Sequence, residues 1–274
     1  MRLAVVGHVE WVWFAVVERV PRAGEIAHVA ESWEDAAGGG GVAAVQLARM
    51  GAEVDFFTAL GDDERGRDAA RALAARGVRV HAAPRAAPQR RAFTFLDADA
   101  ERTITVVGER HVPHGDDSLP WRELESARAV YFTGGDAGAL TAARRAGTLV
   151  ATTRARGPLA GAGVTLDVLV LSGNDPDEAY GPGEVVPAPG LVVTTLGARG
   201  GRWATAGGDA GTWVTTPLPG PPVDSYGCGD TFAAGLTLAL GRGDGVEPAL
   251  AFAARAGAAC LTGRGPYGAP LERA

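Results

Sequence analysis

Lysine is absent from this chain of 274 residues, and all 26 basic residues are arginine. Without lysine the chain cannot carry a G-x-x-x-x-G-K-[ST] phosphate loop, a protein-kinase-type lysine or a Schiff-base lysine. Any phosphate that this protein handles must therefore be held by backbone N–H groups, arginines and a metal ion.

Other features are scarce as well. The two cysteines, Cys228 and Cys260, lie in apolar Gly/Ala-rich segments, which argues against a secreted disulfide framework. No apolar run approaches the length of a membrane span, and the N-terminus reads as a strand rather than a signal peptide. The net charge of −6 provides no basic face for nucleic acid or an anionic membrane. We therefore expect a soluble, cytoplasmic protein that binds neither.

Short Val/Leu-rich runs alternate with Ala/Arg-rich helical stretches along most of the chain. Helices are expected at 43–51 and at 62–77, the second with Asp62 as its cap. This alternation predicts an α/β fold with a mostly parallel central sheet and helices on both faces. The expected strands are 2–7, 52–61, 127–135, 147–153, 166–173 and 191–197.

Two segments, 11–33 and 91–107, break this rhythm because they alternate apolar and polar residues around turn-like breaks. They predict antiparallel strands that form a small β lid over one edge of the main sheet. With no linker or repeat in view, we expect a single domain over 1–274.

The stretch "DSYGCGDTFAAG" (224–235) places glycines directly before an apolar helix face formed by Phe232, Leu236 and Leu240. Unpaired N–H groups at a helix N-terminus attract anions, and Asp230 falls in the first turn. The stretch is therefore either an ordinary capped helix or an anion site that holds a carboxylate.

Glycine clusters also occur at 38–41 and 195–201, where we expect strands to end, and Asn174 and Asp177 follow another strand. In open parallel sheets, ligands bind beyond the carboxyl ends of the strands. Together these clusters outline a cleft with several anion contacts.

The stretch 224–235 resembles the D-T-x-G-A-G-D-x-F-x-x-G signature of the ribokinase-like (PfkB) carbohydrate kinases, and "AGGGGVAAVQLARMG" is similar to their N-terminal signature. "GDDERG", "NDPD" and "TTLGARG" match further motifs in family order, so the likeness covers nearly the whole chain. It implies the ribokinase-like three-layer fold. It also implies ATP-dependent transfer of the γ-phosphoryl group to a hydroxyl of a sugar, sugar acid or related small molecule.

The resemblance assigns roles to individual residues. The backbone of Gly227, Cys228 and Gly229 would form an anion hole for the phosphoryl group, and Asp230 would accept the hydroxyl proton as general base. The acceptor would contact Glu10, Gly38, Gly39, Asp224 and Asp230. The nucleotide would contact Asn174, Thr195, Gly197, Gly200 and Gly229, and Asp177 would hold Mg²⁺ through water. A monovalent cation stays an open alternative.

The residues that grip sugars in the family are altered here. Val42 stands where the family usually has an asparagine, Val12 stands in place of its aspartate, and Glu10 is the nearest carboxylate. The pattern indicates a kinase with an unusual acceptor. A nucleoside kinase is the alternative if Trp11 and Trp13 face the cleft rather than pack in the lid. A non-catalytic nucleotide or ligand sensor is a second alternative, and a dinucleotide oxidoreductase is disfavoured because no G-x-G-x-x-G closes the first βα turn.

Three further expectations concern partners and side chains. The first is a homodimer in which two copies of the chain pair through the lid. The second is that the helix N-terminus lowers the pKa of Cys228. The third is that His111 and His114 are solvated in a Pro/Gly loop.

Overall fold

A nine-stranded sheet forms the centre of the protein in a computed structural model that describes residues 1–273. Its strand order is β13-β12-β11-β10-β9-β8-β1-β4-β5, and all pairs are parallel except β11–β12 and β12–β13. The strands are β1 (Arg2–Val6), β4 (Glu53–Gly61), β5 (Val78–Arg85), β8 (Ala129–Phe132), β9 (Thr148–Thr152), β10 (Val168–Ser172), β11 (Leu191–Thr195), β12 (Gly201–Thr205) and β13 (Ala210–Trp213).

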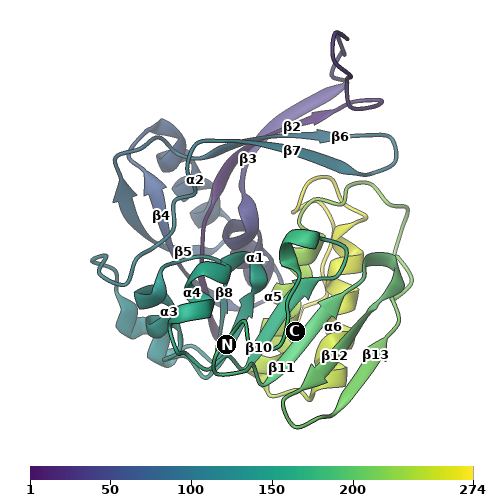
Figure 1. Cartoon of the computed structure of the whole chain (residues 1–274). Coiled ribbons are helices and arrows are strands. Elements are labelled where there is room, and N and C mark those ends of the chain that lie inside the picture. The colour runs from purple at the N-terminus through teal and green to yellow at the C-terminus, as the bar shows by residue number, and fades with distance from the viewer. Residues whose placement is uncertain (274) are drawn as a thin grey trace.

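Helices cover both faces of this sheet, which confirms the predicted three-layer α/β fold (Figure 1). Leu3 and Val5 of β1 belong to the larger core, together with apolar residues of α1 (Gly38–Arg49), α2 (Glu64–Ala75), α5 (Cys228–Arg242) and α6 (Val246–Cys260). Ala4 and Val6 point to the opposite core, which contains α3 (Ala137–Ala143) and α4 (Arg156–Gly161). Alternate residues of a strand point to opposite faces, so these hydrophobic strands are buried on both sides. Among the described residues, no helix is long and apolar enough to cross a membrane.

The lid is a separate four-stranded sheet with the order β3-β2-β6-β7. Its strands are β2 (Glu10–Val16), β3 (Glu31–Ala37), β6 (Arg91–Leu96) and β7 (Arg102–Val107). All pairs are antiparallel except β2–β6, which is parallel. Figure 1 shows this sheet at one end of the large sheet. Because β2 begins at Glu10, shortly after β1 ends at Val6, the lid stands at the carboxyl end of β1.

Within the segment 11–33, where turn-like breaks were expected, residues 17–30 form a connection without regular strand structure. Pro21 and Gly24 explain the interruption, because proline has no N–H for a ladder and Gly24 has φ +84°. The strand resumes only at Glu31.

Two helix starts also differ from expectation. The glycine run 38–41 is the first turn of α1 and follows the lid strand β3, not a strand of the large sheet. This turn lies against the end of β1, because a Cβ on Gly40 would stand 2.6 Å from the carbonyl oxygen of His8. Helix α2 is capped by Asp63 rather than Asp62, and the Asp63 carboxylate accepts the N–H of Gly66 at 2.8 Å.

Candidate active site

Helix α5 begins in a turn that leaves a backbone donor unpaired. Gly227, just before the helix, has φ +80°, which favours glycine, and its carbonyl accepts both the N–H and the hydroxyl of Thr231 at 2.8 Å. Within residues 1–273, no protein group accepts the N–H of Gly229, and a Cβ added there would meet no atom within 4 Å. A free N–H at a helix N-terminus with open space beside it suits a phosphate oxygen.

Asp230 follows in the first turn of α5 and lies against the first turn of α1. A Cβ on Gly39 would stand 3.1 Å from Oδ1 of Asp230 and 3.0 Å from the Thr133 hydroxyl, so a side chain at this position would crowd both oxygens. Burial raises the pKa of Asp230 to about 6, although the charges of Arg154 and Arg102 oppose the shift. Such a carboxylate is ionised at neutral pH and can still accept a proton, as a general base requires.

Glu10 and His8 lie on the other side of the same glycines. Both are buried, and Oε1 of Glu10 stands 2.7 Å from Nε of Arg90 and 3.9 Å from Nε2 of His8. A Cβ on Gly38 would lie 3.1 Å from Cγ of Glu10. Burial raises the pKa of Glu10, and burial lowers the pKa of His8 well below its usual value, so this imidazole is neutral. The fold thus gathers Glu10, Gly38, Gly39 and Asp230, four of the predicted acceptor residues.

Asp224, the fifth predicted acceptor residue, is buried with both carboxylate oxygens occupied. Oδ1 accepts the N–H of Tyr226 and Oδ2 that of Gly265, each at 2.8 Å. Tyr226 in turn accepts the N–H of Gly38 at 3.3 Å through its hydroxyl. Asp224 therefore stabilises the loop that carries Gly227, and Tyr226 connects this loop to α1. A direct contact between Asp224 and the acceptor stays a prediction.

The predicted nucleotide residues meet at the ends of β10 and β11. Gly197 has φ +58°, and a Cβ there would lie 3.2 Å from Nδ2 of Asn174, whose Oδ1 accepts from Arg199 at 3.0 Å. The Thr195 hydroxyl donates to the carbonyl of Leu171 at 3.3 Å. Gly200 has a packing reason to be glycine, because a Cβ would stand 2.0 Å from the Trp213 carbonyl oxygen. These residues therefore lie together at the carboxyl ends of β10 and β11. Their contact with a nucleotide stays a prediction.

The sequence reasoning missed Glu178, the residue after Asp177. Asp177 is exposed, whereas Glu178 is buried and its Oε2 accepts the Ser172 N–H at 2.8 Å. Oε1 of Glu178 stands 2.7 Å from Nε of Arg154, and the charges of both residues act on the pKa of Asp230. Arg154 follows strand β9, and its position after a buried strand was the signal available in the sequence.

Cys228 does not present an acidic thiol to the site. A hydrogen bond with the thiol of Cys260, together with burial, raises the pKa of Cys228. The expectation of a lowered pKa is wrong, because the side chain turns toward Cys260 of α6 while the backbone forms the helix start.

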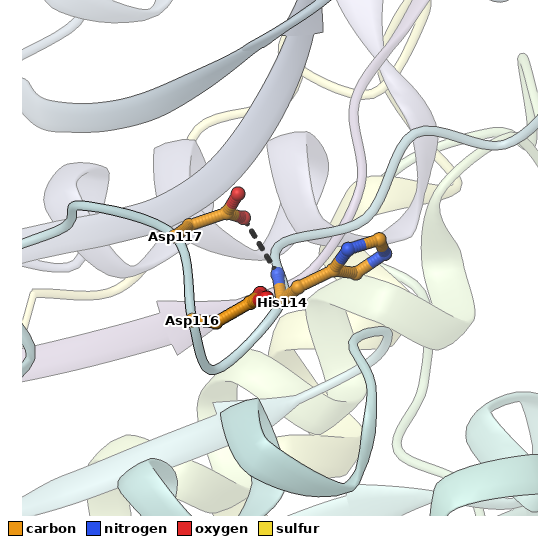
Figure 2. A group of neighbouring side chains, drawn as sticks. All are labelled: His114, Asp116 and Asp117. Atoms are coloured by element: carbon orange, nitrogen blue, oxygen red, sulfur yellow. Dashed lines mark hydrogen bonds between the residues drawn. The ribbon is translucent and has the colours of Figure 1, made fainter.

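Of the two histidines that we expected to be solvated, His111 is buried and His114 is exposed. His111 is buried with Nε2 2.9 Å from the Pro88 carbonyl oxygen, so the expectation that it is solvated is wrong, whereas His114 is exposed. Figure 2 shows His114, Asp116 and Asp117 together, with the His114 N–H donated to Asp117. Arg85 donates hydrogen bonds to both carboxylate oxygens of Asp117, at 2.9 and 2.7 Å. This ion pair accounts for the position of Asp117 in the loop.

A separate apolar cavity of about 230 Å³ lies between α6 and the segments 216–219 and 270–272. None of the predicted site residues lines it.

The protein thus has a three-layer α/β fold with a lid at the carboxyl end of β1. The pfkB family carbohydrate kinase pattern matches residues 1–167 and 180–273. The chain belongs to this family, and it is accordingly an ATP-dependent carbohydrate kinase.

Three relatives illustrate the range of similar proteins. An ATP-dependent ribose-1-phosphate kinase from Halopiger xanaduensis is 28% identical over 297 residues, covering 100% of this chain and 96% of the relative. The ribokinase of Arabidopsis thaliana, solved with ribose and ATP, superposes with a TM-score of 0.76 at 22% identity, covering 98% and 95% of the two chains. A nucleoside kinase from Methanocaldococcus jannaschii superposes with a TM-score of 0.73 at 14% identity, covering 98% and 95%. These two structures share the fold with this chain.

Proposed function

We propose that the protein transfers the γ-phosphoryl group of ATP to a hydroxyl of a sugar, sugar acid or related small molecule, with Asp230 as general base. The proposal is carried by the position of Asp230. Its carboxylate lies against the first turn of α1 at Gly39, and its backbone directly follows Gly229, which has open space beside it and an unpaired N–H.

In this reaction Asp230 accepts the proton of the attacking hydroxyl, whose oxygen forms the new bond to the γ-phosphorus while the bond to ADP breaks. The backbone of Gly227, Cys228 and Gly229 stabilises the charge on the transferring group as an anion hole. Mg²⁺ supplies further charge neutralisation on the phosphates, and the exposed carboxylate of Asp177 is free to orient its water shell. Asn174, Thr195, Gly197 and Gly200 line the nucleotide.

The lid narrows the class of acceptor. Trp11 and Trp13 alternate along β2 with the buried Val12 and Phe14, so they lie on the opposite face of the lid sheet from those two residues. A nucleoside acceptor was favoured only if Trp11 and Trp13 faced the cleft, so their position on the outer face gives that alternative no support. The name of the Halopiger relative adds phosphorylated sugars to the candidate acceptors.

A coupled ADP-release screen over sugars, sugar acids, sugar phosphates, polyols and nucleosides tests this function. Asp230→Asn should lower turnover by about 10²–10⁴-fold with little change in ATP binding, which is the usual contribution of a positioned general base. Asp209→Asn, at the exposed β12–β13 turn, is the matched control and should leave turnover unchanged. ATP binding without ADP release from any acceptor would instead support the sensor alternative.

We also propose that two copies pair through the outer face of the lid, where Trp13 and Phe93 are exposed. A cytoplasmic location stays a prediction, and a monovalent cation stays an open alternative.

A further inference from the structure

Three arginines from separate parts of the chain converge on the acceptor end of the site. Arg90 precedes β6, Arg110 follows β7 and Arg154 follows β9. The charges of all three lower the pKa values of both His8 and Glu10, and Nε of Arg90 lies 2.7 Å from Oε1 of Glu10.

The three guanidinium groups differ in how they are neutralised. Arg90 pairs with Glu10 at 2.7 Å, and Arg154 pairs with Glu178 at 2.7 Å and Asp175 at 2.9 Å. Arg110 forms no ion pair with any residue from 1 to 273, although its surroundings carry the like charges of Arg90 and Arg154. Glu10 pairs directly with Arg90, and its charge also acts on Arg110 by opposing the effect of burial on the pKa of that guanidinium group.

A buried polar atom in the same place also lacks a partner. His8 is 6% exposed, and its Nδ1 has no hydrogen-bond partner among the described residues. A ring atom left unpaired in a buried position costs free energy unless a ligand or water meets it. The ring packs against Gly38 and Gly39, the turn that also lies against Asp230.

A neutral sugar would provide no negative charge for the guanidinium group of Arg110. Val12 and Val42 are fully buried in the core beneath the lid and offer no hydrogen bond to a hydroxyl. A phosphate ester, by contrast, offers three oxygens to guanidinium groups that bind such anions in a fork geometry. It would also neutralise Arg110, which has no carboxylate of its own.

We propose that Arg90 and Arg110 form an anion subsite at the acceptor end, and that the acceptor is a sugar that already carries a phosphate group. The inference rests on the proposed kinase function and adds the class of acceptor to it. The phosphate of the acceptor binds at the lid arginines beside His8, while the hydroxyl to be phosphorylated lies at Asp230. A carboxylate shares the required chemistry, so sugar acids form a separate arm of the test.

The test compares a pentose 1-phosphate, a pentose 5-phosphate, the free pentose and the pentonic acid as acceptors. With wild-type enzyme, kcat/KM for one of the phosphates should exceed that for the free pentose by at least about tenfold, the scale of a charge-assisted contact. Arg110→Gln should remove most of this preference, mainly through KM. Arg91→Gln, an exposed arginine on the outer face of the lid, is the matched control and should retain it.

Calorimetric binding of the preferred pentose phosphate without ATP gives a second readout that does not depend on turnover. Arg110→Gln should weaken this binding about tenfold or more, while Arg91→Gln should largely keep it. Equal or better turnover of the free pentose overturns the subsite and leaves the kinase function intact. A preference for the pentonic acid assigns the subsite to a carboxylate and overturns the phosphate. If no acceptor is phosphorylated, the kinase function fails, and equal binding to wild type and Arg110→Gln then overturns the subsite independently.

Discussion

At the scale of single residues, burial sets the charge state of Asp230, the proposed general base. An aspartate in water has a pKa near 3.8, whereas burial raises the pKa of Asp230 to about 6. Arg154 and Arg102 moderate this increase, while Glu178 and Glu10 reinforce it. The surroundings thus hold the carboxylate near the pH at which it can exchange a proton.

We predict that kcat/KM for the acceptor falls as the pH decreases through about 6. The sign follows because the base must be ionised, and a raised pKa means that the proton is retained up to a higher pH. Glu178→Gln should move this limb to lower pH, since Glu178 raises the pKa of Asp230 and its loss also frees Arg154.

Steady-state profiles between about pH 5 and 8 measure both effects. The γ-phosphate of ATP titrates in the same pH range. A shift of the limb in Glu178→Gln therefore assigns it to Asp230, because this substitution does not alter the pKa of ATP. Glu125→Gln, an exposed glutamate on another part of the surface, should leave the profile in place. An unshifted limb in Glu178→Gln would contradict the assignment to Asp230.

At the scale of elements, the start of α5 joins three parts of the chain. Gly227 packs against α1 and the C-terminal loop, because a Cβ there would stand 3.1 Å from Cγ1 of Val42 and 2.9 Å from Cβ of Pro266. Gly229, two residues later, has open space beside it. The backbone conformation and the packing thus require glycine at position 227, whereas Gly229 leaves space beside the N–H that we propose to bind the phosphoryl group.

We predict opposite behaviour for two alanine variants. Gly227→Ala should lower the stability by about 1–2 kcal/mol, because a left-handed conformation disfavours a side chain, and the contact with Pro266 adds to the loss. Gly229→Ala should fold normally, since alanine is a better helix former, yet its methyl group would occupy the space beside the free N–H. Turnover should then fall on the order of 10²-fold, the scale of a lost anion-hole contact.

Thermal unfolding and ADP release measure these two variants side by side. Wild-type turnover in Gly229→Ala would show that this turn does not hold the transferred phosphoryl group. An unchanged melting temperature in Gly227→Ala would contradict the conformational argument.

At the scale of the whole molecule, the lid has two unlike faces. Its inner face packs Val12, Phe14 and Ala92 against Val42 and Tyr226. On its outer face Trp13 and Phe93, each 37% exposed, meet edge to face at 5.2 Å. Exposed aromatic residues on a sheet face commonly mark a protein interface.

We predict that the chain is a dimer in solution and that the double substitution Trp13→Ser, Phe93→Ser makes it monomeric. Sedimentation equilibrium at several concentrations measures the change. Val186→Ser, which alters a residue that is 61% exposed outside the lid, is the control and should remain dimeric. A monomeric wild type, or a double variant that still dimerises, would exclude the lid as the interface.

Much of the architecture follows from contiguous residues. The alternation of apolar runs with helical stretches predicted the layered sheet, because burial on both faces requires continuous hydrophobic strands. The position of Asp230 after a glycine turn was likewise predictable, since a helix N-terminus is a local property of its first few residues. The presence of turn-like breaks in 11–33 was also predicted, whereas the bounds of the break at 17–30 came only from the structure.

The sequence by itself therefore determined the layers, the family signature and the helix that carries Asp230. Only the tertiary structure decided which side chains are buried against it. Glu178 rather than Asp177 turns inward, and Cys228 meets Cys260 from α6. The charges of Arg90, Arg110 and Arg154, which are distant along the chain, lower the pKa values of Glu10 and His8. The physical reason is that burial and charge proximity depend on which loops meet in space, and no local pattern of residues encodes that meeting.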